Sequence, residues 1–385
     1  MIARSTAPEI RSEEKSDDAF DILILGPVPP PFGGISVHLS RLIPELEHAG
    51  FKVGVLNHFR STALPFVVAS LSKNPLNYYR VPKRFRTRLV HYHHSRWFHL
   101  VALALGKRKS RARYILTLHA GDIQKHFGEL VSTAPFVSRI TRWALSRFDT
   151  VICVDARVAS LVREQLDGQR VEVLPAFLES PGQAGEYDAT IESFFNSGRV
   201  LVVAAYGVQF LEDGRELYGL DAAVHAFTTL APEREDLRLA IFIARRPSRR
   251  RARRHLERLE QRLEGAGIRD RALVVFERPL VPALRANAVF VRPTRAEGDA
   301  LSVREAQRAG IPVVASDVVP RPRGVATFRE DDVAELCATL RAVLDGRIQT
   351  RSNVASVEAT SATDENFSRR LIELYREELA ISRHS

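Results

Sequence analysis

The sequence contains little cysteine, methionine or tryptophan: its 385 residues include two cysteines, one methionine and two tryptophans. Two thiols are too few for the disulfide framework of a small secreted domain. Cys153 and Cys337 each lie alone in an apolar run, without metal-ligand spacing, so we expect both thiols to be buried and inert. Hydrophobic residues make up 45% and charged residues 26%, which excludes a disordered chain.

Long hydrophobic runs are also missing. No apolar stretch approaches the roughly 18 to 20 residues that cross a bilayer, and the best, Phe98–Leu105, is followed by a basic cluster at 107–109. The first 20 residues are polar and lack the apolar centre of a signal peptide. We therefore expect a cytoplasmic protein whose residues 1–18 form a loose tail.

Acidic residues are absent from one long segment. From Phe51 to Ala120 the chain has fourteen Lys and Arg and no Asp or Glu, within a net charge of +10. Such a segment attracts nucleic acid, anionic lipid headgroups or a phosphorylated substrate, although a solubilising face is the alternative. A second basic run, Arg249–Arg254, is either a solvated helix face or a contact for nucleic acid.

Short β-branched runs alternate with helical patterns along the whole chain. Asp21–Gly26 is a continuous apolar run, typical of a strand buried on both faces. Ile35–Ala49 follows it with apolar residues at helical spacing. The alternation continues to Leu174, pauses, and resumes at Val200. Repeated β-α-β order predicts an α/β fold with parallel, doubly wound sheets.

The pause in this pattern predicts a boundary between two domains. Residues 179–198 are rich in Gly, Ser and acidic residues, which is typical of a linker. The expected organisation is a flexible tail over 1–18, an N-terminal domain over 19–180, a linker over 181–198, a C-terminal domain over 199–362 and a final helix within 363–385.

Two of the segments that follow predicted strands contain candidate ligand-binding residues. In GPVPPPFGG, Gly33 and Gly34 let the backbone approach a ligand, and the next helix directs its first N–H groups toward a phosphate. A tight strand-to-helix turn accounts for the same residues. In TLHAGD, His119 can hydrogen-bond a sugar hydroxyl or a developing charge, but a structural histidine is the alternative.

A third segment, RPTRAEGDALSVREAQRAGIPVVASD, is the most informative. Glu297 lies in the loop after a strand, and Glu305 lies eight positions later on a helix. A carboxylate can accept hydrogen bonds from two vicinal hydroxyls, as in a hexose or a ribose. The first N–H groups of the helix offer a diphosphate site with a favourable dipole, near Ala300, Leu301 and Ser302. A surface acid plus a helix-face acid is the alternative interpretation.

With these motifs the chain resembles the GT-B glycosyltransferases of glycosyltransferase family 4, the retaining group that uses nucleotide sugars. The resemblance covers about residues 21–380 and rests on ILGPVPPPFGGISVHLSRLIPELEHAG, TLHAGD, VEVLPAF, LYGLDAAVHAF and, above all, the third segment. It implies two Rossmann-like domains with parallel sheets facing across a cleft. The N-terminal domain would bind the acceptor, the C-terminal domain the donor, and the final helix would cross back to the N-terminal domain.

The resemblance also implies roles for individual residues. Glu297 would contact hydroxyls of the donor sugar, Glu305 the nucleotide ribose, and His119 the sugar at the reaction centre, so that Glu297 and His119 are the predicted catalytic residues. The predicted donor-binding residues are Gly33, Gly34, Arg215, Gly298, Ala300, Leu301, Ser302 and Glu305.

The sequence departs from the family at one position. The family usually has Lys or Arg before a glycine near the diphosphate, and here Tyr218 precedes Gly219. A cation from elsewhere, such as Arg215, Arg245 or Arg246, would then balance the leaving diphosphate.

The implied activity is transfer of a sugar from a nucleoside diphosphate sugar to a hydroxyl acceptor with retention of configuration. The acceptor would be a saccharide or a lipid-linked saccharide in the synthesis of surface polysaccharide or glycan. No metal or other cofactor is expected, because fixed positive groups stabilise the leaving diphosphate. The histidines at 91, 93, 94 and 99 are interpreted as a polar strand end near the acceptor in preference to a metal site.

Partners and alternatives complete these expectations. The basic segment Phe51–Ala120, interleaved with aromatic residues, predicts docking on the anionic inner face of the cytoplasmic membrane. No nucleic-acid partner is expected. A non-catalytic or epimerase-type GT-B protein that binds a sugar nucleotide is the alternative function, and a nucleic-acid-binding protein is a less favoured one. The sequence leaves the base, the sugar, the linkage and the oligomeric state open.

Overall fold

The computed structural model describes residues 19–59, 66–71, 74–93, 96–119, 135–174, 187–297, 300–348 and 354–381. Side chains are described in all of these ranges except at residues 135 and 354–366. The predicted tail over residues 1–18 lies outside the described residues. The chain divides into two compact units: Met1–Pro30, Ile35–Glu179 and Thr363–Ser385 form the first, and Pro31–Gly34 and Ser180–Ala362 form the second.

The first unit contains a seven-stranded sheet with the order β3-β2-β1-β4-β5-β6-β7, and all of its strand pairs are parallel. Its strands are β1 (Ala19–Gly26), β2 (Val53–Asn57), β3 (Val67–Ser70), β4 (Arg86–His93), β5 (Arg113–Leu118), β6 (Thr150–Cys153) and β7 (Val171–Val173). Its helices are α1 (Gly34–His48), α2 (Pro75–Arg84), α3 (Trp97–Lys107), α5 (Pro135–Leu145), α6 (Ala156–Gln165) and α12 (Val354–Ile381).

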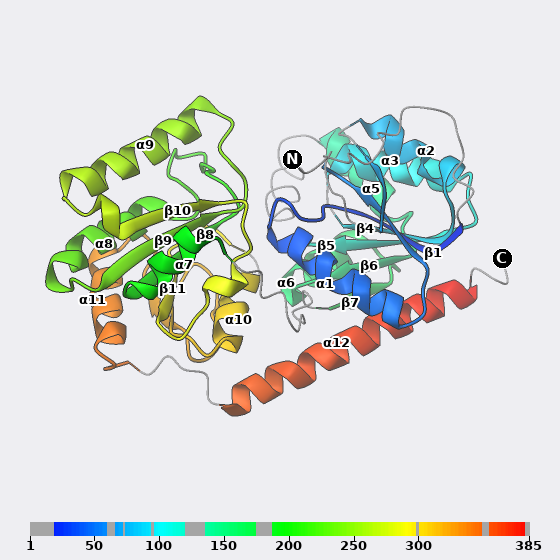
Figure 1. Cartoon of the computed structure of the whole chain (residues 1–385). Helices are drawn as coiled ribbons and strands as arrows, with labels where there is room; N and C mark the ends of the chain where they lie inside the picture. Colours follow the sequence, from blue (N-terminus) through cyan, green and yellow to red (C-terminus); the bar gives the residue numbers. More distant parts are fainter. Residues whose placement is uncertain are drawn as a thin grey trace. The chain divides into compact units, whose positions relative to one another are not determined.

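Helices cover both faces of this sheet (Figure 1). Successive side chains of a strand point to opposite faces, so Leu23 and Leu25 of β1 pack in one cluster with residues of α2, α3, α5 and α6. Ile22 and Ile24 pack in the other cluster with residues of α1 and α12. This two-sided burial explains why β1 is a continuous apolar run and not an alternating one.

The second unit has a six-stranded parallel sheet with the order β10-β9-β8-β11-β12-β13. Its strands are β8 (Arg199–Ala205), β9 (Leu237–Ile243), β10 (Ala272–Phe276), β11 (Ala288–Arg292), β12 (Val313–Ser316) and β13 (Ala326–Phe328). Its helices are α7 (Ala189–Asn196), α8 (Leu220–Leu230), α9 (Arg250–Gly265), α10 (Leu301–Arg308) and α11 (Val333–Leu344). Both sheets confirm the predicted α/β class with parallel, doubly wound strands.

The segment predicted to be a linker contains a helix. Over residues 187–198 the chain forms α7, whose N-cap Asp188 accepts a hydrogen bond from the Ile191 amide at 3.2 Å. Ile191 and Phe195 are buried in a cluster with strands of the second sheet. Residues 189–196 of the predicted linker are thus helical, because two apolar side chains on one helix face pack against the second sheet.

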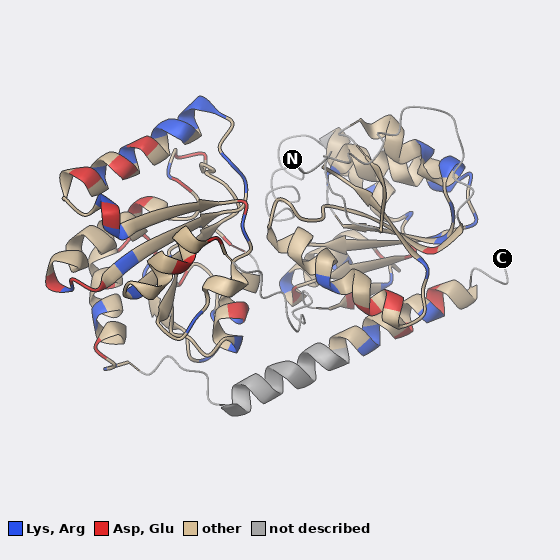
Figure 2. Cartoon of the chain, viewed as in Figure 1, with Lys and Arg blue, Asp and Glu red and all other residues tan. Residues whose placement is uncertain are grey.

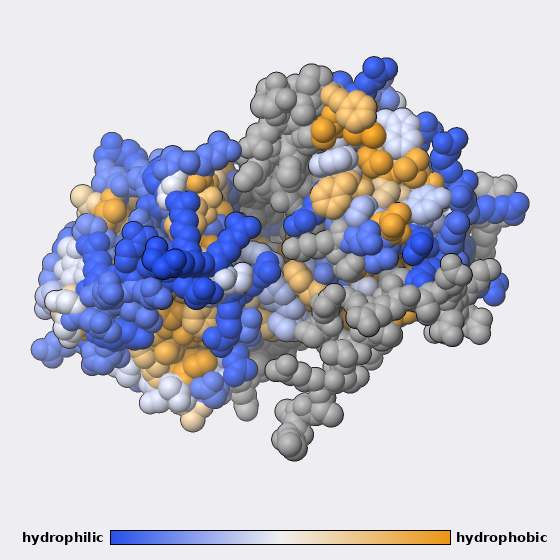
Figure 3. Space-filling view, turned by 90° about the horizontal axis from the view of Figure 1, so that it is seen from above, coloured by the Kyte–Doolittle hydropathy of each residue, from blue (hydrophilic) through white to orange (hydrophobic). Residues whose placement is uncertain are grey.

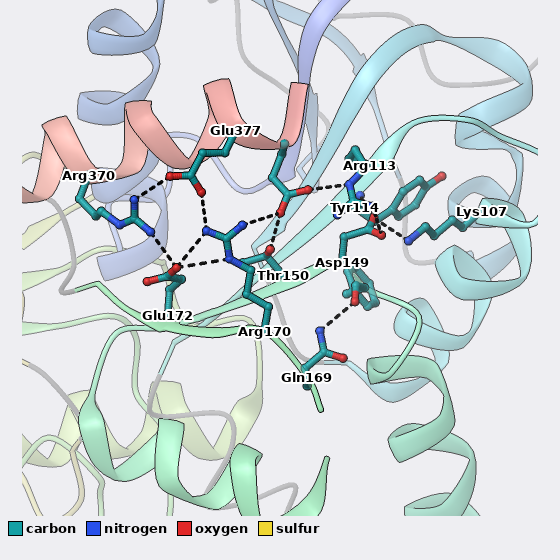
Figure 4. Close-up of polar contacts among 12 residues, drawn as sticks. Lys107, Arg113, Tyr114, Asp149, Thr150, Gln169, Arg170, Glu172, Arg370 and Glu377 are labelled. Atoms are coloured by element: carbon teal, nitrogen blue, oxygen red, sulfur yellow. Dashed lines mark hydrogen bonds and ion pairs between the residues drawn. The ribbon is translucent and has the colours of Figure 1, made fainter. Parts of the chain in front are cut away.

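The final helix packs on the first unit through both apolar and charged side chains. Leu371, Leu374 and Tyr375 of α12 lie in the cluster that contains α1. The carboxylate of Glu378, fully buried, accepts hydrogen bonds from Arg113 Nε at 2.6 Å and Thr150 Oγ1 at 2.6 Å. Figure 4 shows the strand residues of this network turned toward the helix. The helix begins at residue 354, earlier than the sequence pattern predicted.

Both cysteines are free and buried, as predicted, and burial raises the pKa of the Cys153 thiol to about 12. Arg residues are concentrated in the first turns of α9 (Figure 2). The Arg251 guanidinium lies 3.9 Å from the centre of the Phe210 ring.

None of the helices in the described ranges has the length and hydropathy needed to cross a bilayer.

Candidate functional site

The strand order places a candidate binding site in the second unit. From β8 the chain first adds β9 and β10 on one side and then β11, β12 and β13 on the other, so the winding reverses between β8 and β11. Ligands of doubly wound sheets bind at the carboxyl ends of the strands where such a reversal opens a crevice. Arg292 is the last residue of β11, and its Nη1 donates a hydrogen bond of 2.6 Å to the Ala204 carbonyl of β8.

Glu297 lies between two arginines at this edge of the sheet. Its Oε1 accepts from Arg292 Nε at 2.7 Å, and its Oε2 accepts from Arg321 Nη1 at 2.6 Å. The Glu297 and Arg321 side chains are only 4% and 3% exposed. Arg321 also donates through Nε to the Ser316 carbonyl at 2.7 Å. Two guanidinium groups thus share the Glu297 carboxylate, and charge-assisted hydrogen bonds of this kind are the strong ones.

Tyr218 and Gly219 lie against the same strand end. The Arg292 guanidinium is 5.2 Å from the centre of the Tyr218 ring. Gly219 has a φ of 68°, and a Cβ there would lie 1.8 Å from the Pro293 carbonyl oxygen, so only glycine fits. At the position before Gly219, where the resemblance implies Lys or Arg, this chain has Tyr218. The Tyr218 ring contacts the guanidinium group of Arg292, the last residue of β11.

Glu216 is a buried carboxyl group beside these residues. Its two oxygens accept hydrogen bonds from the amides of Tyr218 at 3.0 Å and Leu220 at 2.9 Å. Burial nevertheless raises the pKa of Glu216 to about 7, because the charged form loses hydration. Glu216 was not among the predicted site residues. A single glutamate two positions before Tyr218 belongs to no recognisable sequence motif, so the sequence contained no signal for it.

The predicted donor-binding residue Arg215 is paired with acidic side chains. It forms ion pairs with Asp213 at 2.7 Å, with Glu330 at 3.1 Å and with Asp331. Its side chain is 44% exposed. Three carboxylates therefore surround the Arg215 guanidinium, whereas Arg292 and Arg321 pair with one carboxylate, that of Glu297.

Helix α10 follows Glu297 and bears the other predicted donor residues. Its N-cap Ala300 makes no side-chain capping bond, and the first turn contains no acidic residue. Leu301 is buried, whereas Ser302 and Glu305 are partly buried on the helix. The Val303 amide donates to the Ala300 carbonyl at 3.0 Å, and the positive end of the helix dipole lies at this first turn. Gly298 lies outside the described residues.

The first unit brings the other predicted catalytic residue into a cluster of histidines. His119 directly follows β5, and its Nε2 lies 3.3 Å from Nδ1 of His93 at the end of β4. His93 and His91 face the same side of the sheet, with ring centres 3.9 Å apart. Within the described ranges, no group of three or more His, Cys, Asp or Glu has a geometry that could hold a metal ion.

The predicted glycines lie at the start of α1, after the loop that follows β1. The Gly33 amide donates to the Pro31 carbonyl at 3.1 Å, and Gly34 is the exposed first residue of α1. A Cβ at Gly34 would meet no atom within 4 Å. No packing against described protein atoms therefore requires glycine at this position, which was predicted because a ligand could approach its backbone. Their role toward a ligand stays a prediction.

Comparison with known protein families agrees with this geometry. A family model for "Glycosyltransferase Family 4" matches residues 32–179, and one for "Glycosyl transferases group 1" matches residues 194–346. The chain is a GT-B glycosyltransferase of the family 4 type. Apart from residues 32–34, the first match falls on the first unit, and the second match falls on the second unit and includes both Glu297 and Glu305.

Solved structures show the same fold as this glycosyltransferase at low sequence identity. Sucrose-phosphate synthase from Thermosynechococcus elongatus has a TM-score of 0.69 and 17% identity, over 94% of this chain and 100% of that chain. HepE from Anabaena, in complex with UDP and glucose, has a TM-score of 0.67 and 14% identity, over 92% and 99% of the two chains. At these identities the likeness establishes the fold alone.

One curated relative is more similar over a shorter segment. The lipopolysaccharide core biosynthesis mannosyltransferase LpsB of Rhizobium meliloti (strain 1021) is 35% identical over 118 residues. The matched segment is 28% of the glycosyltransferase described here and spans about a third of the relative's length (33%). The match therefore supports the enzyme class and leaves the substrates to be proposed.

Proposed function

We propose that this glycosyltransferase moves a sugar from a nucleoside diphosphate sugar to a hydroxyl group with retention of anomeric configuration. The bond between the sugar C1 and the diphosphate oxygen breaks, the acceptor oxygen bonds to C1, the acceptor hydroxyl loses its proton, and the nucleoside diphosphate leaves. The acceptor proposed is a lipid-linked saccharide in surface polysaccharide or glycan synthesis. HepE, one of the similar structures, was solved with UDP-glucose, which supports the donor class.

The arrangement around Glu297 is the observation that carries this proposal. The guanidinium groups of Arg292 and Arg321 both bind the Glu297 carboxylate, with side chains 12% and 3% exposed, and α10 begins four residues after Glu297. Donor groups fixed in a partly dry site stabilise developing negative charge without reorganising. The leaving diphosphate is the group that gains negative charge when the bond to C1 breaks, and we propose that these guanidinium groups and helix N–H groups bind it without a metal ion.

Donor binding is testable by thermal stabilisation. We expect one nucleotide class, from a panel of UDP-, GDP-, ADP- and TDP-sugars, to raise the melting temperature of the wild type. A ligand at 100 times its dissociation constant adds about 2.7 kcal/mol to the free energy of unfolding. The Glu305→Ala variant should lose this shift, because the proposed ribose contact is removed.

Glu264→Ala is the matched control, because Glu264 is an exposed residue in the last turn of α9. It should keep the full ligand-induced shift. If no nucleotide sugar stabilises the wild type, the donor proposal fails and a non-catalytic protein, which the Tyr218 substitution favours, becomes the better conclusion. If a donor binds, analysis of the products decides further: an epimerase forms a new nucleotide sugar without any acceptor, and a scaffold forms none.

We also propose that the first unit docks on an anionic membrane through the face formed by α2, α3 and α5. Figure 3 shows hydrophobic side chains gathered on this face of the unit. Leu76, Trp97 and Phe136 are 53%, 37% and 75% exposed, each near the start of one of these helices. Aromatic and aliphatic side chains of this kind insert at the boundary between headgroups and acyl chains.

Basic residues on the same helices add electrostatic attraction. Tertiary contacts balance part of the acid-free segment: Lys107 and Arg113 form ion pairs with Asp149, and Arg88 pairs with Asp21. Other cations on these helices, or directly after α3, stay exposed, namely Arg80, Lys83, Arg108, Lys109, Arg139 and Arg142. Each cation near an anionic surface contributes about 1 kcal/mol, so this face suits the cytoplasmic leaflet, where a lipid-linked acceptor would lie.

Co-sedimentation with vesicles of phosphatidylglycerol and phosphatidylcholine tests the docking. We expect binding at low salt, a large decrease at 0.5 M salt because charges are screened, and at least tenfold weaker binding for Trp97→Ser/Phe136→Ser. Val281→Ser, a 39% exposed position in the second unit, is the control and should bind as the wild type does. Equal binding of the double variant and the wild type, or no binding to the vesicles at all, would contradict this docking face.

A further inference from the structure

The carboxylate of Glu216 closes the turn that leads into α8. One of its oxygens accepts a hydrogen bond from the Tyr218 amide at 3.0 Å, and the other accepts one from the Leu220 amide at 2.9 Å. Leu220 is the first residue of α8, and the N-cap Gly219 makes no side-chain capping bond. Glu216 therefore caps the helix from upstream, and its negative charge lies at the positive end of the helix dipole.

The segment after β11 holds the same turn from the other side. Thr294 Oγ1 and the Arg295 amide donate to the Leu217 carbonyl at 3.0 Å and 2.8 Å. Arg295 also donates through Nη1 to the Glu216 carbonyl at 2.6 Å. Glu216 is 2% exposed and the Arg295 side chain 6%. Buried hydrogen bonds therefore fix the turn on both sides, and the Glu216 carboxylate accepts two of them.

This turn sets the position of the Tyr218 ring. The centre of the ring lies 5.2 Å from the Arg292 guanidinium, and Arg292 Nε donates to the Glu297 carboxylate at 2.7 Å. All of these residues belong to the second unit. A change in the turn therefore reaches Glu297 through Tyr218 and Arg292, within one compact body.

The arrangement at Glu216 requires the ionised carboxylate. Two N–H groups point at its two oxygens, whereas a carboxylic acid has a hydrogen on one oxygen and is the weaker acceptor. Burial raises the pKa of Glu216 to about 7; the two amides lower it, Asp221 raises it and Arg295 lowers it. Arg292 and the Tyr218 hydroxyl also interact with its charge. Near neutral pH the group therefore exchanges between both forms.

We propose that Glu216 is a positioning residue for the donor: its ionised carboxylate holds the turn that places Tyr218 against Arg292, and a nucleoside diphosphate sugar binds to this form. Donor affinity then falls as the pH falls through the pKa of Glu216 and is constant above it. This consequence rests on the proposed function, whereas the contact of the carboxylate with the two amides is a property of the second unit alone.

Amide NMR of the full chain labelled with ¹⁵N-tyrosine tests this contact without any ligand. The Tyr218 signal is assigned by its loss in Tyr218→Phe. We expect the wild-type Tyr218 amide to titrate with a midpoint near pH 7, because the charge on its acceptor changes. Glu216→Gln should abolish this titration. Glu212→Gln, the same change at an exposed glutamate of the same loop, is the control and should titrate as the wild type does.

Two results would overturn the proposal at this stage: no titration of the wild-type Tyr218 amide near neutral pH, or the same titration in folded Glu216→Gln. The described histidines of the second unit, His225 and His255, do not account for a midpoint near 7, because burial lowers the pKa of both below 6.5. The other tyrosine amide signals report whether each variant is folded.

Donor affinity at two pH values tests the positioning role. The probe is whichever UDP-, GDP-, ADP- or TDP-sugar stabilises the wild type. One pH unit below its pKa, about a tenth of Glu216 is ionised, so the Kd of the wild type and of Glu212→Gln should be about tenfold higher at pH 6 than at pH 8. Calorimetry measures both values.

Glu216→Gln should bind the same sugar nucleotide about tenfold more weakly than the wild type at pH 8, because its NH₂ group faces one of the two amides. Its Kd should change less than about twofold between the two pH values. A wild-type affinity independent of pH, or an unchanged pH dependence in Glu216→Gln, would overturn the positioning role. If the wild type binds none of the sugar nucleotides, the proposed function and the positioning role both fail, and the amide titration still decides the contact.

Discussion

Glu297→Ala is expected to lower the free energy of unfolding of the second unit by about 3–5 kcal/mol. The substitution leaves Arg292 and Arg321 buried, 12% and 3% exposed, without the carboxylate that now accepts hydrogen bonds from both. Two unpaired guanidinium groups close together also repel each other. Urea denaturation followed by circular dichroism measures the effect, and loss of the nucleotide-sugar thermal shift should accompany it.

Two further variants test whether the loss of stability in Glu297→Ala comes from leaving two arginines buried without a carboxylate partner. Arg321→Met in the Glu297→Ala background removes one of the stranded cations and should restore part of the lost stability, so the two changes are not additive. Glu260→Ala removes an exposed partner of Arg269 in the same unit, at 3.2 Å, and should cost less than about 1 kcal/mol. If Glu297→Ala and Glu260→Ala cost the same, the carboxylate does not hold the two arginines as described.

The second large effect is expected for Glu378→Ala in the C-terminal helix. The Glu378 side chain is fully buried and accepts hydrogen bonds from Arg113 and Thr150, with Arg170 at 3.5 Å (Figure 4). Loss of this buried partner should cost about 3–5 kcal/mol and weaken the packing of α12 on the first unit. Limited proteolysis should then cleave the chain within α12 at least tenfold faster than in the wild type.

Glu373→Ala is the matched control for this prediction. Glu373 lies on the same helix, its side chain is 50% exposed, and its contact with Arg370 is 3.7 Å long. We expect its effect on stability to stay within about 0.5 kcal/mol and its cleavage rate to match the wild type. Equal cleavage of the Glu373 and Glu378 variants would show that the charged contacts do not hold the helix in place.

The sequence was most informative where burial on both faces of a sheet imposes long apolar runs. It predicted most strands and the parallel winding, because β1 and β8 tolerate few polar side chains between two layers of helices. It did not predict α2, which contains two prolines, at positions 75 and 82, and it recognised α3 only as a short apolar run. A helix that owes its stability to packing has a weak local signal.

The sequence likewise identified some residues of the candidate site and missed others. Glu297 and Glu305 were found from a local motif, because a strand, a loop and a helix that follow one another in sequence are also neighbours in space. Arg321 was not found: it approaches Glu297 from a loop 24 residues later, and no spacing identifies a partner at that distance. The sequence also suggested Arg215 as the missing cation, but three carboxylates from two segments surround it.

The sequence by itself determined the two parallel α/β units, the family and the segments where a nucleotide sugar is expected to bind, because apolar periodicity and short motifs are local properties of the chain. Only the tertiary structure decided which charges are paired and which cations of the acid-free segment stay exposed. These properties depend on side chains brought together from segments as far apart as β4 and α12, where burial removes water and leaves protein groups as the available partners of charges and hydrogen-bonding atoms.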